Sequence, residues 1–308
     1  MTSTTPVGRR VGVLLCGLSA IAFALLGPFG IPVFATGAGV NTVIGWRFLI
    51  AAAAVWVIVA VTRRPVGRGR ALWQPLVMGA VLYATQSGLY FLALQRLTVG
   101  LTSLLLYTMP VMVVLVSVAT RRERPSVRMF AALTLAVGGV GLTLLGPGVG
   151  SISGIGVLLG LGSAVVYTIY FFGMDTLPAR TDRIAATALI CSGAAAAHIV
   201  VGSLRGVFDW RPPVDLLIWV IAMAGVSTVL AMMMLLTGIS GAGASIASVV
   251  SCLEPITAVL LGAVLFADPF GPVQWLGTAG VVGAVVLLGL RSGPAAAVVA
   301  EPESMIVR

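Results

Sequence analysis

Ionisable side chains lie inside apolar stretches of this chain, where a charge is costly to keep. Glu254 stands directly before Pro255 within such a stretch. Hydrocarbon favours the neutral form of a carboxyl group, and a carboxyl that gains and loses a proton could link proton movement to another process. Pro255 has no N–H, so we expect it to free the carbonyl near position 251 and to bend its helix. The alternative is that Glu254 bonds this freed backbone and only stabilises the bend.

Two basic side chains lie in apolar stretches as well. Arg47 lies near the start of one, and its guanidinium could bind a carboxylate through two parallel N–H groups. Alternatively, its long side chain reaches water at the end of the stretch. His198, the only histidine, could exchange protons near neutral pH. The alternative is a neutral imidazole that bonds the backbone or lies at an interface.

Polar and aromatic residues recur together at helical spacing in three places. The three sets are Tyr83, Gln86, Ser87 and Tyr90; Ser163, Tyr167 and Tyr170; and Ser103 and Tyr107 with Pro110. Residues three and four positions apart lie on one face of an α-helix. Such faces either line an internal cavity or form hydrogen bonds between helices.

The composition identifies the solvent of these helices. Hydrophobic residues make up 59% of the 308 residues and charged residues only 9%, against roughly 25% charged residues in soluble domains. The mean hydropathy is +1.12. Long runs of Ala, Leu, Val and Gly are typical of helices, whereas a β-barrel would alternate apolar and polar residues. The lipid bilayer is therefore the main surrounding medium.

Ten apolar segments are long enough to cross a hydrocarbon layer of roughly 30 Å. They are 11–33, 42–61, 72–94, 98–119, 128–146, 153–174, 184–203, 215–238, 243–267 and 272–290. We expect an all-α polytopic membrane protein with ten transmembrane helices, followed by a disordered tail over 291–308.

The two halves of the chain repeat each other. Gly-Val-Leu-Leu at 12–15 recurs at 156–159, and Pro110 corresponds to Pro255 at an offset of about 144–145 residues. Met109 holds the position that corresponds to Glu254. Five spans is an odd number, so the repeats 11–146 and 153–290 must enter the membrane in opposite orientations, as inverted repeats do.

The arginines predict the orientation. One set of alternate links holds Arg9, Arg10, Arg63, Arg64, Arg68, Arg70, Arg121, Arg122, Arg124, Arg128, Arg180 and Arg183, with Arg291 and Arg308 in the tail. The other set holds only Arg96, Arg205 and Arg211. Because cytoplasmic links are rich in Lys and Arg, both termini are expected in the cytoplasm of a cell-membrane protein.

Other kinds of partner have little support. The net charge of +9 comes from arginines in short links, which indicates orientation and not nucleic-acid binding. Cys16, Cys191 and Cys252 form no C-x-x-C pair and no cluster with histidine, so no metal site is predicted. The chain has no lysine and no ATP-binding glycine motif, and we expect no cofactor.

A family resemblance rests on particular residues. These are Arg47 in the second span, Phe91-Leu92-Ala93-Leu94 at the end of the third, Met109-Pro110 in the fourth and Leu253-Glu254-Pro255 in the ninth. With its two five-span repeats, the chain resembles the EamA-type family of the drug/metabolite transporter superfamily over about residues 11–290. It departs from the family pattern at Met109 and at the fourth-span ending Thr120 to Glu123.

The resemblance implies a secondary transporter that works in the outward direction. With the two inverted repeats, we expect alternating access around a central cavity and transport of small metabolites or amino-acid-like solutes. Under this interpretation the substrate cavity is lined by Arg47, Tyr83, Gln86, Tyr90, Tyr107, Ser163, Tyr167 and Tyr170. Glu254 and His198 are the candidates for coupling to protons or sodium. The resemblance implies no particular substrate and no oligomeric state.

Two other function classes are open. A membrane-embedded enzyme would need a cluster of catalytic side chains, but the chain offers one histidine and one clearly intramembrane carboxylate, far apart in sequence. We therefore do not expect an enzyme. A receptor or scaffold that transports nothing would require neither repeats nor polar faces.

Overall fold

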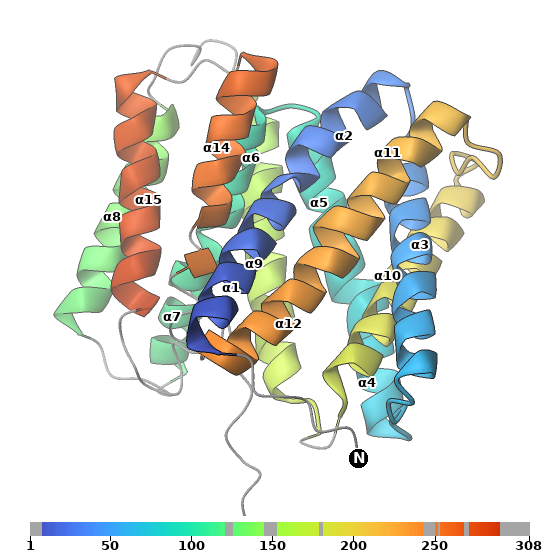
Figure 1. Cartoon of the computed structure of the whole chain (residues 1–308). Coiled ribbons are helices and arrows are strands. Elements are labelled where there is room, and N and C mark those ends of the chain that lie inside the picture. Colours follow the sequence, from blue (N-terminus) through green and yellow to red (C-terminus); the bar gives the residue numbers. More distant parts are fainter. Residues whose placement is uncertain are drawn as a thin grey trace, which may run out of the picture.

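A computed structural model describes residues 8–120, 126–144, 153–178, 181–242, 250–251, 253–267 and 271–289. Within these ranges every regular element is a helix (Figure 1). The first half contains α1 (Arg9–Ala24), α2 (Leu26–Ala35), α3 (Val40–Val61), α4 (Arg70–Met78), the π-helix η1 (Gly79–Tyr83), α5 (Ala84–Leu94), α6 (Val99–Leu106), α7 (Met109–Ala119) and α8 (Val127–Leu144). The second half contains α9 (Gly154–Asp175), α10 (Arg183–Leu204), α11 (Val214–Ala224), the π-helix η3 (Gly225–Leu230), α12 (Ala231–Ala242), α14 (Leu253–Phe266) and α15 (Pro272–Gly289).

The expected all-helical membrane architecture is confirmed. Among the described residues, 7 helices are long and apolar enough to cross a membrane, and two shorter apolar helices cover Phe130–Thr143 and Leu253–Phe266. The number of ten spans stays a prediction. The expected tail 291–308, Cys252 and Glu123 lie outside the described residues.

Several spans that the hydropathy pattern predicts as single helices are interrupted. The first is divided at Leu25 into α1 and α2, and the fourth is divided at Tyr107 and Thr108 into α6 and α7. The third and the eighth each contain a π-helical segment, η1 and η3. π-helical turns are rare and are often found at functional sites. The two segments therefore indicate corresponding candidate functional regions in the two halves.

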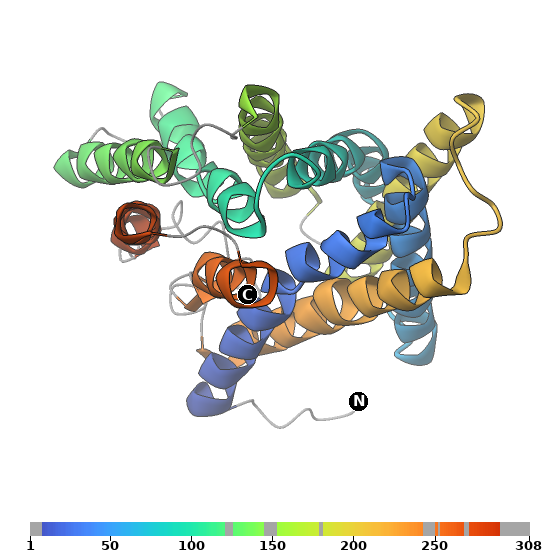
Figure 2. The same ribbon diagram turned by 90° about the horizontal axis from the view of Figure 1, so that it is seen from above.

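The contacts between helices follow the repeat. Helix α1 of the first half packs on α12 of the second half. Helix α9 is the counterpart of α1 and α5 is the counterpart of α12, and these two helices are also in contact. Helices α3 and α10 form one close pair, and α8 and α15 form another. Figure 2 shows α12 passing beside α1. Helix α1 begins and α15 ends on the same side of the bundle, at the bottom of Figure 1.

Glycines bring the two halves close together at three crossings. The pairs are Gly12 with Gly238, Gly79 with Gly193, and Gly139 with Gly277. A Cβ atom at Gly193 would lie 2.1 Å from the carbonyl oxygen of Leu76, and one at Gly277 would lie 2.4 Å from that of Gly139. Since real Cβ atoms do not approach so closely, each crossing needs a residue without a side chain.

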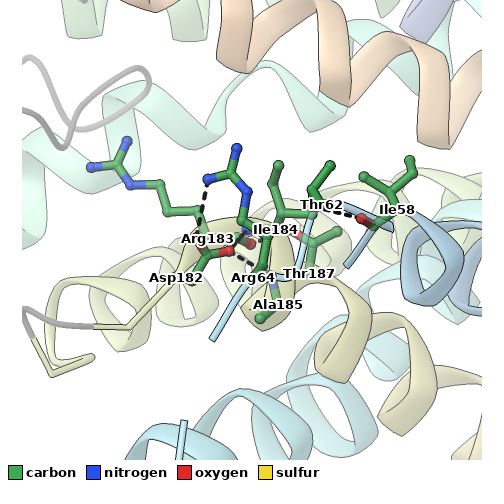
Figure 3. Close-up of polar contacts among 8 residues, drawn as sticks. All are labelled: Ile58, Thr62, Arg64, Asp182, Arg183, Ile184, Ala185 and Thr187. Carbon is green, nitrogen blue, oxygen red and sulfur yellow. Dashed lines mark hydrogen bonds and ion pairs between the residues drawn. The ribbon is translucent and has the colours of Figure 1, made fainter. Parts of the chain in front are cut away.

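One ion pair joins two helix ends at the lower side of the bundle (Figure 3). Asp182 caps α10 by accepting hydrogen bonds from the N–H groups of Ile184 and Ala185, both at 3.0 Å. Its other carboxylate oxygen receives Nη1 of Arg64 at 3.2 Å. Arg64 follows α3, so the pair holds the end of α3 beside the start of α10. The exposed Arg64 limits the stabilisation to about 0–1 kcal/mol.

Candidate functional site

Helices of both halves enclose a cavity of about 180 Å³. Its wall is formed by Phe23, Leu26, Arg47, Tyr83, Gln86, Ser87, Tyr90, Phe91, Leu106, Tyr107, Met109, Tyr167, Leu235, Ser251 and Glu254. The first half supplies most of the wall, and α9, α12, Ser251 and α14 of the second half complete it. The cavity therefore lies where the two repeats meet, which is the usual place of a substrate site in repeat-built transporters.

Arg47 enters this wall from α3 and is only 4% exposed. Its Nε and Nη2 groups donate hydrogen bonds to Oγ1 of Thr228, at 3.1 and 3.0 Å. The guanidinium also lies over the rings of Phe48 and Phe91, at 4.8 and 5.8 Å from their centroids. These contacts turn the side chain toward the bundle interior and away from the nearby helix end.

The polar face of the third span lies on the cavity wall as a unit. Tyr83 from η1 and Gln86, Ser87 and Tyr90 from α5 all line the cavity. Gln86 is held in place from α9, because its Nε2 donates to Oγ of Ser163 at 3.1 Å and the Ser163 hydroxyl donates to the backbone carbonyl of Gln86 at 3.1 Å. Ser163 thus lies behind Gln86 and not on the wall.

Tyrosines pack in a row beside this face. The ring of Tyr170 lies 5.3 Å from that of Tyr83 and 5.8 Å from that of Tyr167, measured between centroids. Tyr167 lines the cavity, whereas Tyr170 lies behind it. Aromatic contacts at these distances are favourable and restrict ring motion. Tyr170 therefore supports the two tyrosines that reach the cavity.

Glu254 lies in the same wall beside Tyr107. The Tyr107 hydroxyl lies 2.6 Å from Oε2 of Glu254 and 3.3 Å from the carbonyl oxygen of Ser251. Pro255 cannot bond that carbonyl because it has no N–H. An ionised Glu254 accepts the phenolic hydrogen. A protonated Glu254 can donate to the phenol oxygen while Tyr107 donates to Ser251, so the site has partners for both proton states.

His198 of α10 lies away from the cavity and faces α3 and α5. Its Nδ1 faces Oδ1 of Asn41 at 3.0 Å, and its Nε2 lies 3.1 Å from the carbonyl oxygen of Ala84. Because a carbonyl only accepts, Nε2 carries the hydrogen. His198 thus bonds the backbone of α5, the helix that carries Gln86 and Tyr90.

Sequence reasoning missed Thr228, which is 6% exposed and holds Arg47. A single threonine in an apolar span gave no signal, because only the π-helical geometry of η3 and the packing of η3 against α3 bring it to Arg47. It also did not assign Met109 to the wall, although its correspondence with Glu254 could have suggested this. Within the described ranges, no three His, Cys, Asp or Glu side chains gather as metal ligands would.

The chain matches known proteins over most of its length. A model of the EamA-like transporter family matches twice, over residues 10–145 and 154–290. The uncharacterized transporter YcbK of Bacillus subtilis is 26% identical over 262 residues, which cover 80% of this chain and 82% of that protein. The uncharacterized transporter YwfM of the same organism is 25% identical over 259 residues, with 80% and 81% covered.

The fold also has a solved counterpart. A protein crystal structure with 19% sequence identity covers 92% of this chain and 98% of its own chain, with a TM-score of 0.64. This likeness concerns the fold alone. The two matches of the family model, one to each half, explain why the helix contacts repeat. The chain belongs to the EamA-like transporter family and is a multi-pass membrane transporter.

Proposed function

We propose that this chain is a secondary transporter that moves small metabolites or amino-acid-like solutes outward across the cell membrane. The observation that carries this proposal is the polar-aromatic cavity between the two halves, with Arg47 and Glu254 both in its wall. Charged residues inside a membrane bundle are expensive and mark solute or ion pathways. A guanidinium and a carboxyl group in one cavity suit a solute that carries both a carboxylate and an amine.

The size of the cavity favours a metabolite over a drug. Its volume of about 180 Å³ lies below the roughly 300–1,000 Å³ of pockets that enclose drug-sized ligands. The wall combines tyrosines and polar groups with apolar side chains such as Phe23, Leu26 and Leu235. A solute with a polar backbone and a modest apolar side chain fits this pattern.

Alternating access is supported by the construction of the bundle. The halves meet through corresponding helix pairs, so exchanging their conformations would close one side of the cavity and open the other. The interruptions at Leu25 and at Tyr107–Thr108, together with η1 and η3, provide places where helices can bend. The first three interruptions are at or next to the cavity wall, and η3 contacts the wall through the hydrogen bonds of Thr228 with Arg47.

Coupling to protons is the role we propose for Glu254. Tyr107 and the Ser251 carbonyl provide partners for its ionised and protonated forms. Sodium is the alternative coupling ion. His198 is a second candidate. Because its Nε2 already carries a hydrogen, a further proton would bind Nδ1 and would change the contact of His198 with Asn41 of α3. The arginine-rich lower side of the bundle is the cytoplasmic side in this proposal.

The test is exchange of radiolabelled solutes in liposomes that contain the purified full-length chain. Amino acids and small metabolites are screened with and without an imposed proton or sodium gradient. We expect exchange of at least one solute above empty liposomes, and faster movement when the coupling gradient is present. Folded protein that exchanges none of these solutes would contradict the proposal and favour a scaffold or receptor.

A further inference from the structure

We infer that Arg47 is the binding site for a carboxylate group of the transported solute, with Thr228 as the residue that positions it. This inference rests on the proposed function and adds a ligand group to it. Four observations support it: the N–H groups of Arg47 that have no hydrogen-bond partner among the described residues, the charged groups near Arg47, the hydrogen bonds of Arg47 with Thr228, and the cavity that Arg47 lines.

The guanidinium keeps one edge for a ligand. Arginine has five N–H donors, and Thr228 receives one from Nε and one from Nη2. Among the described residues, Thr228 is the only hydrogen-bond partner that the structure gives this side chain. The remaining donors are the two on Nη1 and the second on Nη2. One from each nitrogen forms the end-on fork that matches the two oxygens of a carboxylate.

No described carboxylate forms an ion pair with Arg47. Arg64 and Asp182 form the ion pair at the lower side of the bundle, and no described carboxylate lies within 4.0 Å of the Arg47 guanidinium. Glu254 shares the cavity but bonds Tyr107. A buried cation without a counter-ion is strongly unfavourable. The rings of Phe48 and Phe91 attract the guanidinium but do not neutralise it. An anionic group of the solute would supply the missing charge.

Thr228 orients the guanidinium plane. Its hydroxyl hydrogen is engaged with the carbonyl of Met223, five residues earlier, at 3.2 Å. The oxygen lone pairs therefore face Arg47 and accept its two N–H groups. Thr228 lies in the π-helical segment η3, and this side-chain bond reaches back to Met223 in α11. The π-helix thus has a definite role in holding Thr228 where it fixes Arg47.

The cavity in front of Arg47 favours a singly charged group. Among the described residues, Arg47 is the only cationic side chain in the wall, whereas a phosphate with two charges would require more. Tyr83 of the same wall has a hydroxyl group that can also donate to an anion. A carboxylate needs only the fork and one such donor. We therefore assign the subsite to a monocarboxylate group and not to a phosphate.

The experiment compares solutes that differ only in this group. Liposomes that contain the wild-type protein are loaded with one L-amino acid at a time. Exchange is then measured with the same amino acid outside, or with its carboxamide, in which –NH₂ replaces –O⁻ of the carboxylate. A hydrogen bond to a charged group contributes about 10- to 100-fold in affinity. We expect the amide to compete on the order of 10- to 100-fold more weakly than the acid.

Variants connect this preference to the residues. Arg47→Gln should abolish the preference for the acid, and Thr228→Val should weaken it, whereas Thr228→Ser keeps the hydroxyl and should restore it. The matched control is Arg96→Gln, because Arg96 is exposed, bonds its own helix at Leu92 and is not in this wall. This variant should retain the wild-type preference.

Three results would overturn the inference. The first is that the wild-type protein exchanges amides as well as it exchanges acids. This comparison uses no variant, so it still holds if Arg47→Gln fails to fold. The second is a folded Arg47→Gln variant that still prefers acids. In both cases exchange persists, so the proposed function stands while the carboxylate site falls. The third is the absence of exchange for every solute, which contradicts the proposed function itself.

Discussion

The phenol of Tyr107 lies 2.6 Å from the carboxyl group of Glu254 and so joins the fourth span of the first repeat to the ninth span of the second. The two residues meet in the wall of the central cavity. Met109 holds the position equivalent to Glu254 in the first repeat and lines the same cavity. The repeats are therefore alike in fold but differ at this site, where one contributes a titratable group and the other a thioether.

Replacing Glu254 by Gln tests proton coupling. Gln keeps hydrogen-bonding capacity but does not titrate. We expect Glu254→Gln to exchange solute in liposomes while losing the dependence of exchange on pH that the wild type shows. Asp215→Asn is the matched control, since Asp215 lies exposed in the first turn of α11, and it should keep the wild-type pH profile. An unchanged profile in Glu254→Gln would leave Glu254 with a structural role only.

Truncating the third-span face should reduce transport without loss of folded protein. For Tyr83→Ala, Gln86→Ala and Tyr90→Ala we expect at least about a tenfold lower exchange rate, because each removes a group from the cavity wall. Gln95→Ala is the control for Gln86→Ala, because Gln95 is exposed at the end of α5.

Ser163→Ala separates the two roles of Gln86. It removes the hydroxyl that holds the Gln86 side chain but leaves the wall intact. If Ser163→Ala lowers exchange as much as Gln86→Ala does, positioning explains the effect. If the amount of folded protein falls in parallel with exchange in all of these variants, the residues are packing elements and the cavity assignment is wrong.

The orientation of the chain can be read by cysteine labelling in intact cells. Val66 lies exposed in the link between α3 and α4, and Gly39 lies exposed in the link between α2 and α3. A Cβ at Gly39 would lie 3.6 Å from its nearest neighbour, so a cysteine fits there. An impermeant maleimide should label Gly39→Cys and not Val66→Cys, with the wild type as the blank. The reverse pattern would invert the topology.

Two adjacent glycines in α8 should respond to alanine in opposite directions. A Cβ at Gly139 would lie 2.6 Å from the Gly277 carbonyl oxygen, whereas at Gly138 it would meet nothing within 4 Å. Gly139→Ala should cost about 1–3 kcal/mol through overpacking. Gly138→Ala should be neutral or stabilise by up to about 1 kcal/mol through helix propensity. Thermal unfolding in detergent measures both, and equal midpoints would refute the close crossing.

Sequence reasoning succeeded where a local pattern decides the outcome. The apolar runs predict the membrane helices, and the spacing of Tyr83, Gln86, Ser87 and Tyr90 predicts that they share a face. Periodicity within one helix is sufficient for this conclusion. The correspondence of Pro110 with Pro255 likewise indicated the repeat that the family match confirms.

The same reasoning could not determine which helices meet. Ser163 and Tyr170 share a helix face with Tyr167 by spacing, yet they lie behind the wall. Spacing does not predict this, because the rotation of α9 against α5 depends on tertiary packing. Thr228 reaches Arg47 only through η3, and hydropathy does not predict a π-helical turn. His198 bonds Ala84 because α10 packs beside α5.

The central claim is that solute moves through the cavity between the repeats, and filling that cavity tests it most directly. Met109 lines it and is 6% exposed, so Met109→Trp places an indole ring in a space of about 180 Å³. Val264→Trp, at a position 78% exposed on α14, adds the same ring outside the cavity. With both variants purified as folded protein, exchange in liposomes should vanish for Met109→Trp and persist for Val264→Trp. Wild-type exchange by folded Met109→Trp would contradict the account.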